Sequence, residues 1–93
     1  MIIGVCRVCL TAEWSASLKE KRTVVKGITE KVKNRFNVSI AEIEKQDMHK
    51  EIVIGFACVS NESRHAQSTV QRVLNFIESH TEAVVTDVET EII

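Results

Sequence analysis

The chain of 93 residues contains no proline and only three glycines, Gly4, Gly27 and Gly55, which stand far apart. A phosphate-cradling loop needs several glycines at close spacing, so the sequence excludes nucleotide-binding motifs of that kind. Repeats, low-complexity stretches and linker-like segments are also missing, and the length suits one compact unit. We therefore predict a single domain over residues 1–93.

Aromatic residues and long apolar runs are scarce as well. The four aromatic residues are too few for a base-stacking platform, and Ile54, Phe56 and Cys58 stand where RNA-recognition domains need a basic residue and aromatics. No apolar run is long enough to span a membrane. The N-terminus also lacks the charged start and cleavage site of a signal peptide. We expect a cytoplasmic protein with no membrane partner.

Cysteine and histidine do not form a recognisable reactive group. Three cysteines without an export signal indicate reduced thiols rather than a disulfide framework. Cys6 and Cys9 spell C-x-x-C, but on a strand residues three apart point to opposite faces. His49, His65 and His80 lie on separate segments with no triad or ligand spacing. The sequence predicts no metal, no cofactor and no catalytic residue, and therefore a protein that is not an enzyme.

Hydrophobic periodicity predicts four strands and two helices. The first and third strands are apolar on both faces, as expected for strands covered on two sides. The run Ser17-Leu18-Lys19-Glu20 has the capping-box pattern and opens the first helix, and Asn37 breaks it. The expected strands are residues 2–11, 38–44, 52–59 and 83–93, and the expected helices are residues 17–36 and a second helix that starts within residues 60–63 and ends near His80.

The order β-α-β-β-α-β is that of a ferredoxin-like sandwich in the α+β class. Right-handed crossovers place the first and third strands in the centre of a four-stranded antiparallel sheet of order 4-1-3-2. The two helices cover one face of this sheet.

The other face of the sheet would then expose apolar residues of the central strands. Either Ile3, Val5 and Cys9 or their neighbours Ile2, Cys6, Val8 and Leu10 must lie on it, with a matching half of the third strand. Because monomers seldom expose so large an apolar patch, we predict a homo-oligomer, most simply a dimer. A monomer with an apolar open face is the alternative. The candidate oligomer-face residues are Ile3, Val5, Cys9, Ile54 and Phe56.

Charge is unevenly distributed although the net charge is only -1. Seven basic residues lie between residues 17 and 35, whereas residues 78–93 carry five acidic residues and no Lys or Arg. Cations in the first turn of a helix oppose its dipole, but they suit a phosphate group there. The alternative is a solvated helix face balanced by Glu20 and Glu30. The candidate RNA- or anion-binding residues are Lys19, Lys21, Arg22, Lys26 and Lys33.

Trp14 stands in the loop just before the first helix. It either packs over the sheet edge, which we favour, or serves as an exposed contact for a partner.

The run Ser17-Leu18-Lys19-Glu20-Lys21-Arg22, followed by Arg35-Phe36-Asn37-Val38-Ser39, resembles the signature of the YlxP-like family of small bacterial proteins. The resemblance extends through Val59-Ser60-Asn61 to Phe76-Ile77-Glu78, whereas His49 stands where members often carry tryptophan. It implies a ferredoxin-like fold and no assigned activity. Genes of the family often lie beside those of a translation initiation factor and a ribosome-binding factor.

The gene neighbourhood implies a role near ribosome maturation, with ribosomal RNA or a ribosomal subunit as partner. The alternative function is a dimeric ligand-sensing or protein-interaction module.

Overall fold

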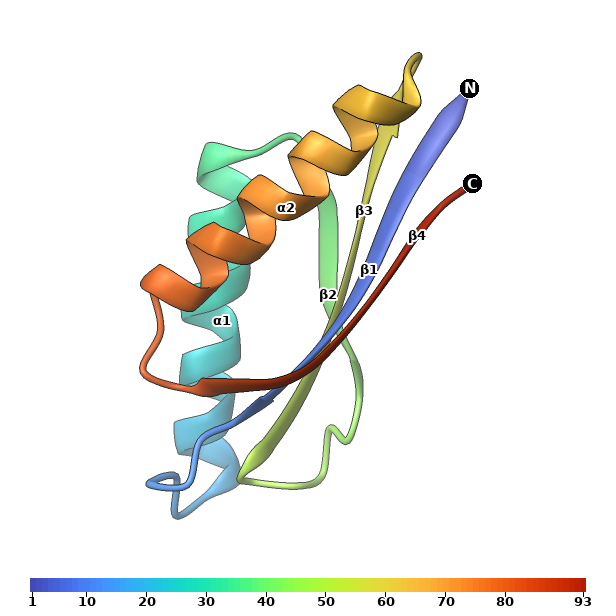
Figure 1. Ribbon diagram of the computed structural model, residues 1–93. Helices are drawn as coiled ribbons and strands as arrows, with labels where there is room; N and C mark the ends of the chain where they lie inside the picture. The colour runs from blue at the N-terminus through green and yellow to red at the C-terminus, as the bar shows by residue number, and fades with distance from the viewer.

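The computed structural model describes residues 1–93, and its elements follow one another in the predicted order β-α-β-β-α-β (Figure 1). No strand limit differs from the predicted one by more than one residue. The elements are β1 (Ile2–Thr11), α1 (Leu18–Arg35), β2 (Ser39–Glu44), β3 (Glu51–Ser60), α2 (Ser63–Ser79) and β4 (Val84–Ile92).

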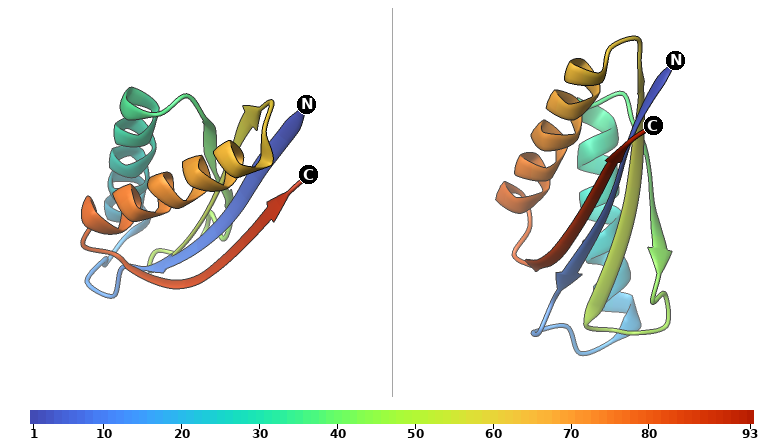
Figure 2. Two further views of the ribbon diagram at one scale, coloured as in Figure 1. Left: turned by 45° about the horizontal axis from the view of Figure 1, so that its top comes forward. Right: turned by 45° about the vertical axis from the view of Figure 1, so that its right-hand side comes forward.

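The four strands form one antiparallel sheet in the order β2-β3-β1-β4, which is the predicted order 4-1-3-2 read from the opposite edge. Both helices lie on the same side of this sheet, and no element covers the other side (Figures 1 and 2). The ferredoxin-like α+β fold is therefore confirmed. We call the uncovered side of the sheet the open face.

The hydrophobic core lies between the sheet and the helices. Alternate residues of β1 and β3 point into it, because the pairing places Cys6 opposite Phe56 and Val8 opposite Ile54. The helices contribute stripes of apolar residues with helical spacing. The buried helix residues are Val25, Ile28 and Val32 of α1 and Ala66, Val70, Val73, Leu74 and Ile77 of α2.

Two of the predicted oligomer-face residues, Ile54 and Phe56, do not lie on the open face. Ile54 is 0% and Phe56 is 3% exposed, and both pack beneath the helices. Their assignment to the open face is wrong because they pair with Cys6 and Val8, which point toward the helices, and paired residues share a face. The uncharged residues of β3 on the open face are Val53, Gly55, Ala57 and Val59.

The start of α1 is close to the prediction. Ser17 has extended backbone angles, and its hydroxyl accepts a hydrogen bond from the backbone N–H of Glu20 at 3.1 Å. The Glu20 carboxylate reaches back, but it accepts from the N–H of Ala16 at 3.2 Å rather than from that of Ser17. Both bonds satisfy backbone donors near the end of the helix and set its first residue at Leu18.

Both edge strands contain an irregularity. The pairing of β4 with β1 shifts at Thr86, so that Val85 and Val88 lie opposite Leu10 and Val8 on the helix side. The alternation of side chains between the two faces of the sheet is therefore interrupted along this strand. The pairing of β2 with β3 shifts at Ile43 in the same manner. Such bulges interrupt the exposed edges of the sheet and discourage edge-to-edge pairing.

Candidate functional site

Lys21 is a structural residue rather than a surface cation. Its side chain is 0% exposed, and its ammonium lies 2.7 Å from Oε2 of Glu42. The ammonium also donates hydrogen bonds to the carbonyls of Lys45, Gln46 and Glu51, at 2.7–3.3 Å. The prediction that Lys21 binds RNA or an anion is wrong, because its charge is used to fix the β2–β3 connection beneath α1.

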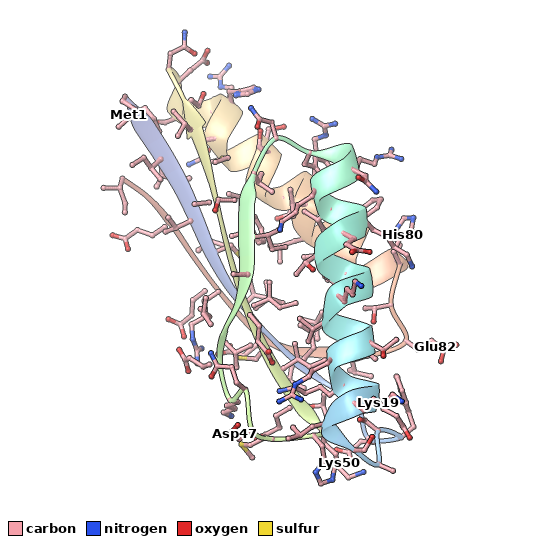
Figure 3. The ribbon with its side chains drawn as sticks, turned by 180° about the vertical axis from the view of Figure 1, so that it is seen from behind. Met1, Lys19, Asp47, Lys50, His80 and Glu82 are labelled. Carbon is pink, nitrogen blue, oxygen red and sulfur yellow. The ribbon has the colours of Figure 1, made fainter.

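Lys50 makes the reciprocal link from that connection. Its ammonium donates to the carbonyls of Glu13 and, at 3.1 Å, of Ser15 in the β1–α1 loop. Lys19, Asp47 and Lys50 consequently lie at the same end of the molecule, far from Met1 (Figure 3). Lys21 and Lys50 hold the β1–α1 and β2–β3 loops together at this end, and so fix where α1 begins.

The other four predicted cations share one side of α1. Lys19, Arg22, Lys26 and Lys33 are all exposed, and their spacing of three, four and seven residues aligns them along the helix. We call these four residues the α1 stripe. Only Lys26 has a carboxylate within 4.0 Å, that of the equally exposed Glu30. The stripe is thus open to solvent and almost uncompensated.

The two layers of the molecule carry opposite charge. The helices α1 and α2 contain nine basic and three acidic residues, whereas the four strands contain one basic residue, Arg7, and six acidic ones. Because the helices cover one side of the sheet only, the near-zero net charge conceals a basic side and an acidic side.

A second group of cations on the helix layer was missed from the sequence. The guanidinium of Arg35 lies 5.4 Å from the ring centre of Phe76, and that of Arg72 lies 5.6 Å from the ring centre of Phe36. The two rings meet edge to face at 5.4 Å. The four-residue spacing of Arg72 and Phe76 placed these two residues on one helix side, but the contact between α1 and α2 is not visible in the sequence.

Trp14 remains 51% exposed. It therefore does not pack closely over the sheet edge, and the interpretation favoured from the sequence does not hold. It lines a shallow groove between α1 and the α2–β4 connection. Gly27 lies in the same groove, and a Cβ atom added to it would meet nothing within 4 Å. A contact of Trp14 with a partner stays a prediction.

The open face is apolar only in part. Ile3, Val5 and Cys9 lie on it, each half-buried, as one of the two predicted arrangements required. Between them stands Arg7, which bonds the edge strands on both sides of it. Its guanidinium makes two hydrogen bonds of 2.9 Å to Glu44 of β2 and one of 3.2 Å to Glu89 of β4. A homo-oligomer through this face stays a prediction.

The Arg7 bridge was not foreseen, because its partners are 37 and 82 residues away in the chain. The hydrogen bond from Arg7 holds the pKa of the Glu44 carboxyl below its usual range. The same bond raises the pKa of Arg7, which stays charged in any case. The one signal in the sequence was a charged residue in the middle of an otherwise apolar strand.

The three cysteines are free thiols, and Cys6 and Cys9 point to opposite faces of β1. Burial raises the pKa of Cys6 to about 11, which leaves almost no thiolate at neutral pH. We expect an excess of iodoacetamide to alkylate Cys9 in the native protein well before the buried Cys6 and Cys58. Peptide mass spectrometry after timed quenching measures this order, and labelling in urea is the control. Equal rates for all three thiols in the native protein would contradict the structure.

No group of three or more His, Cys, Asp or Glu side chains is placed to hold a metal ion. None of the helices is both long and apolar enough to cross a membrane.

Comparison with known proteins identifies relatives over most of the chain. Residues 3–90 match the model of a family described as protein of unknown function (DUF503). A protein of Bacillus subtilis (strain 168), named uncharacterized protein YlxP, is 46% identical over 77 residues, which cover 83% of this chain and 84% of the relative.

Solved structures share the fold at low identity. A de novo designed protein with ferredoxin fold, LFR1 1, has a TM-score of 0.55 at 19% identity. The match covers 98% of this chain and 88% of the designed chain. An antibiotic biosynthesis monooxygenase has a TM-score of 0.51 at 12% identity, covering 100% and 96% of the two chains. These similarities support the fold and carry no function.

Proposed function

The chain belongs to the YlxP-like family of proteins of unknown function (DUF503), and from this premise we propose that it is a non-enzymatic accessory protein that binds RNA phosphates through α1. The observation that carries the proposal is the α1 stripe. Its four exposed cations follow one side of a helix, and only one of them has a carboxylate within reach.

The physical argument concerns counterions and distance. A helix of 18 residues is about 27 Å long, so a stripe along it can contact several successive phosphates. Each phosphate neutralised by Lys or Arg releases condensed counterions, which drives binding at low salt. The acidic side of the sheet would repel the same RNA, so that one side of the molecule alone is suited to it.

We expect replacement of the four stripe residues by glutamine to weaken RNA binding by about tenfold or more at low salt. The slope of log affinity against log salt concentration should fall by about 3, since each single-strand phosphate contact contributes about 0.7. Fluorescence anisotropy with a labelled single-stranded RNA, at several salt concentrations, measures both quantities. Lys21 is left unchanged because its replacement would disturb the fold.

A matched control removes the same number of cations from elsewhere on the helix layer. A variant with glutamine at Lys31, Arg35, Arg64 and Arg72 has the same net charge as the stripe variant and leaves the stripe intact. We expect it to bind RNA much more tightly than the stripe variant. Equal losses in the two variants, or no binding by the folded wild-type protein at low salt, would overturn the proposal.

The gene neighbourhood of the family makes ribosomal subunits the first natural RNA to test. Co-sedimentation with purified subunits is expected at low salt, to be lost at high salt and in the stripe variant.

A further inference from the structure

The open face contains a hollow of about 540 Å³, on the side of the sheet away from the α1 stripe. Its floor and one side are made of small residues, Ala41 of β2 with Gly55 and Ala57 of β3. The side chain of Ile43 lies over Gly55, where an added Cβ atom would come within 2.9 Å of it. Val5 lies directly opposite Ala57 on β1 and completes an apolar floor. The hollow therefore exists because side chains here are short, and not because the strands separate.

The rim of the hollow is acidic. Glu89 and Glu91 of β4 line it, on the side opposite Ile43. Glu91 has no ion pair and no side-chain hydrogen bond, and Glu89 uses one oxygen only, toward Arg7. Arg7 itself is already compensated, since three of its hydrogen bonds go to Glu44 and Glu89. The hollow thus combines an apolar floor with unpaired negative charge at one edge.

We propose that this hollow receives a lysine or arginine side chain from a partner protein. The methylene stem of such a side chain covers apolar surface while its charged end stays near the rim, where Glu91 and the free oxygen of Glu89 face it. Opposite charge on the two surfaces selects this partner over others. A second copy that presents its own open face is disfavoured, because that face carries Glu44, Asp87, Glu89 and Glu91 against a single Arg7.

The test is an NMR titration with N-acetyl-valyl-lysyl-valine amide, a probe that carries one cationic side chain and no charged terminus. We expect saturable changes in the amide signals of Ala41, Gly55 and Ala57. The peptide with glutamine in place of lysine should bind at least about threefold more weakly, as expected for an exposed ion pair. Free lysine amide should bind more weakly than the tripeptide, because the flanking valines of a protein segment add apolar contact.

Variants separate the charge of the rim from the shape of the hollow. Glu91→Gln should remove most of the difference in affinity between the lysine and glutamine peptides. Glu78→Gln, on the exposed side of α2, should leave that difference unchanged. Ala57→Leu should fill the hollow and abolish the signal changes. If Ala57→Leu fails to fold, Ala41→Leu, on the exposed part of the neighbouring strand β2, should fill the hollow instead.

Three results would overturn the inference. The glutamine peptide could bind as tightly as the lysine peptide, or the hollow-filling variants, still folded by circular dichroism, could bind the probe normally. Sedimentation velocity could show a wild-type dimer that Ala57→Leu dissociates, in which case a second copy occupies the face. None of these outcomes depends on RNA binding by α1.

Discussion

Lys21→Met is expected to lower the free energy of unfolding by about 3–5 kcal/mol, the usual cost of removing one partner from a buried ion pair. The methionine fits the space of the lysine stem but leaves the Glu42 carboxylate and three backbone carbonyls without their donor. Loss of the partner of Glu42 Oε2 should cost the most free energy, because this buried oxygen has no other hydrogen bond. Against a total stability of about 5–15 kcal/mol for a domain, this loss is large. Urea denaturation followed by far-ultraviolet circular dichroism measures it.

Two further variants test the cause of this loss. Lys19→Met lies two residues away on the same helix, is exposed, and should change the stability by less than about 0.5 kcal/mol. In the double variant Lys21→Met/Glu42→Gln the carboxylate is neutral, so the combined loss should be smaller than the sum of the two single losses. A Lys21→Met protein as stable as wild type would show that the ammonium does not have these partners.

Phe56→Ala is expected to cost about 3–5 kcal/mol, because it leaves a cavity in the core beneath the helices. Phe56 is 3% exposed and belongs to the cluster that includes Val8, Ile54 and Val73. Thermal or urea unfolding of the purified variant measures the loss. The result bears directly on which side of the sheet the helices cover.

Val59→Ala is the matched control, since it truncates an apolar residue of the same strand on the open face. Val59 is 68% exposed, and its truncation should cost less than about 1 kcal/mol. Equal losses for the two variants would contradict the placement of the helices. A greater loss for Val59→Ala would show that the open face is covered in solution.

The element order and the sheet order could be predicted because they depend on local patterns. Ser17 and Glu20 mark the start of α1 by a hydrogen-bonding pattern confined to a few residues. The two-sided apolar runs of β1 and β3 identify central strands, and the handedness of the crossovers then leaves one arrangement. The α1 stripe was predicted for the same reason, since its members belong to a single helix.

The roles of Lys21 and Arg7 could not be predicted with the same means. Lys21 stands four residues before Val25 and seven before Ile28, so its position on the buried stripe was the available signal. The partners that make its burial tolerable come from a loop more than twenty residues away. Arg7 meets Glu44 and Glu89 only because the sheet places β4 next to β1 on one side and β2 just beyond β3 on the other.

The amino-acid sequence by itself determined which segments form strands and helices, since hydrophobic period and capping act within a few residues. It did not determine which side of β1 and β3 faces the helices, because both sides are apolar and a period of two is satisfied either way. The tertiary structure decided this by packing Cys6, Val8, Ile54 and Phe56 under α1 and α2. The same choice left Gly55 and Ala57 on the open face, where Glu89 and Glu91 of β4 lie across β1 from them, and so produced the hollow.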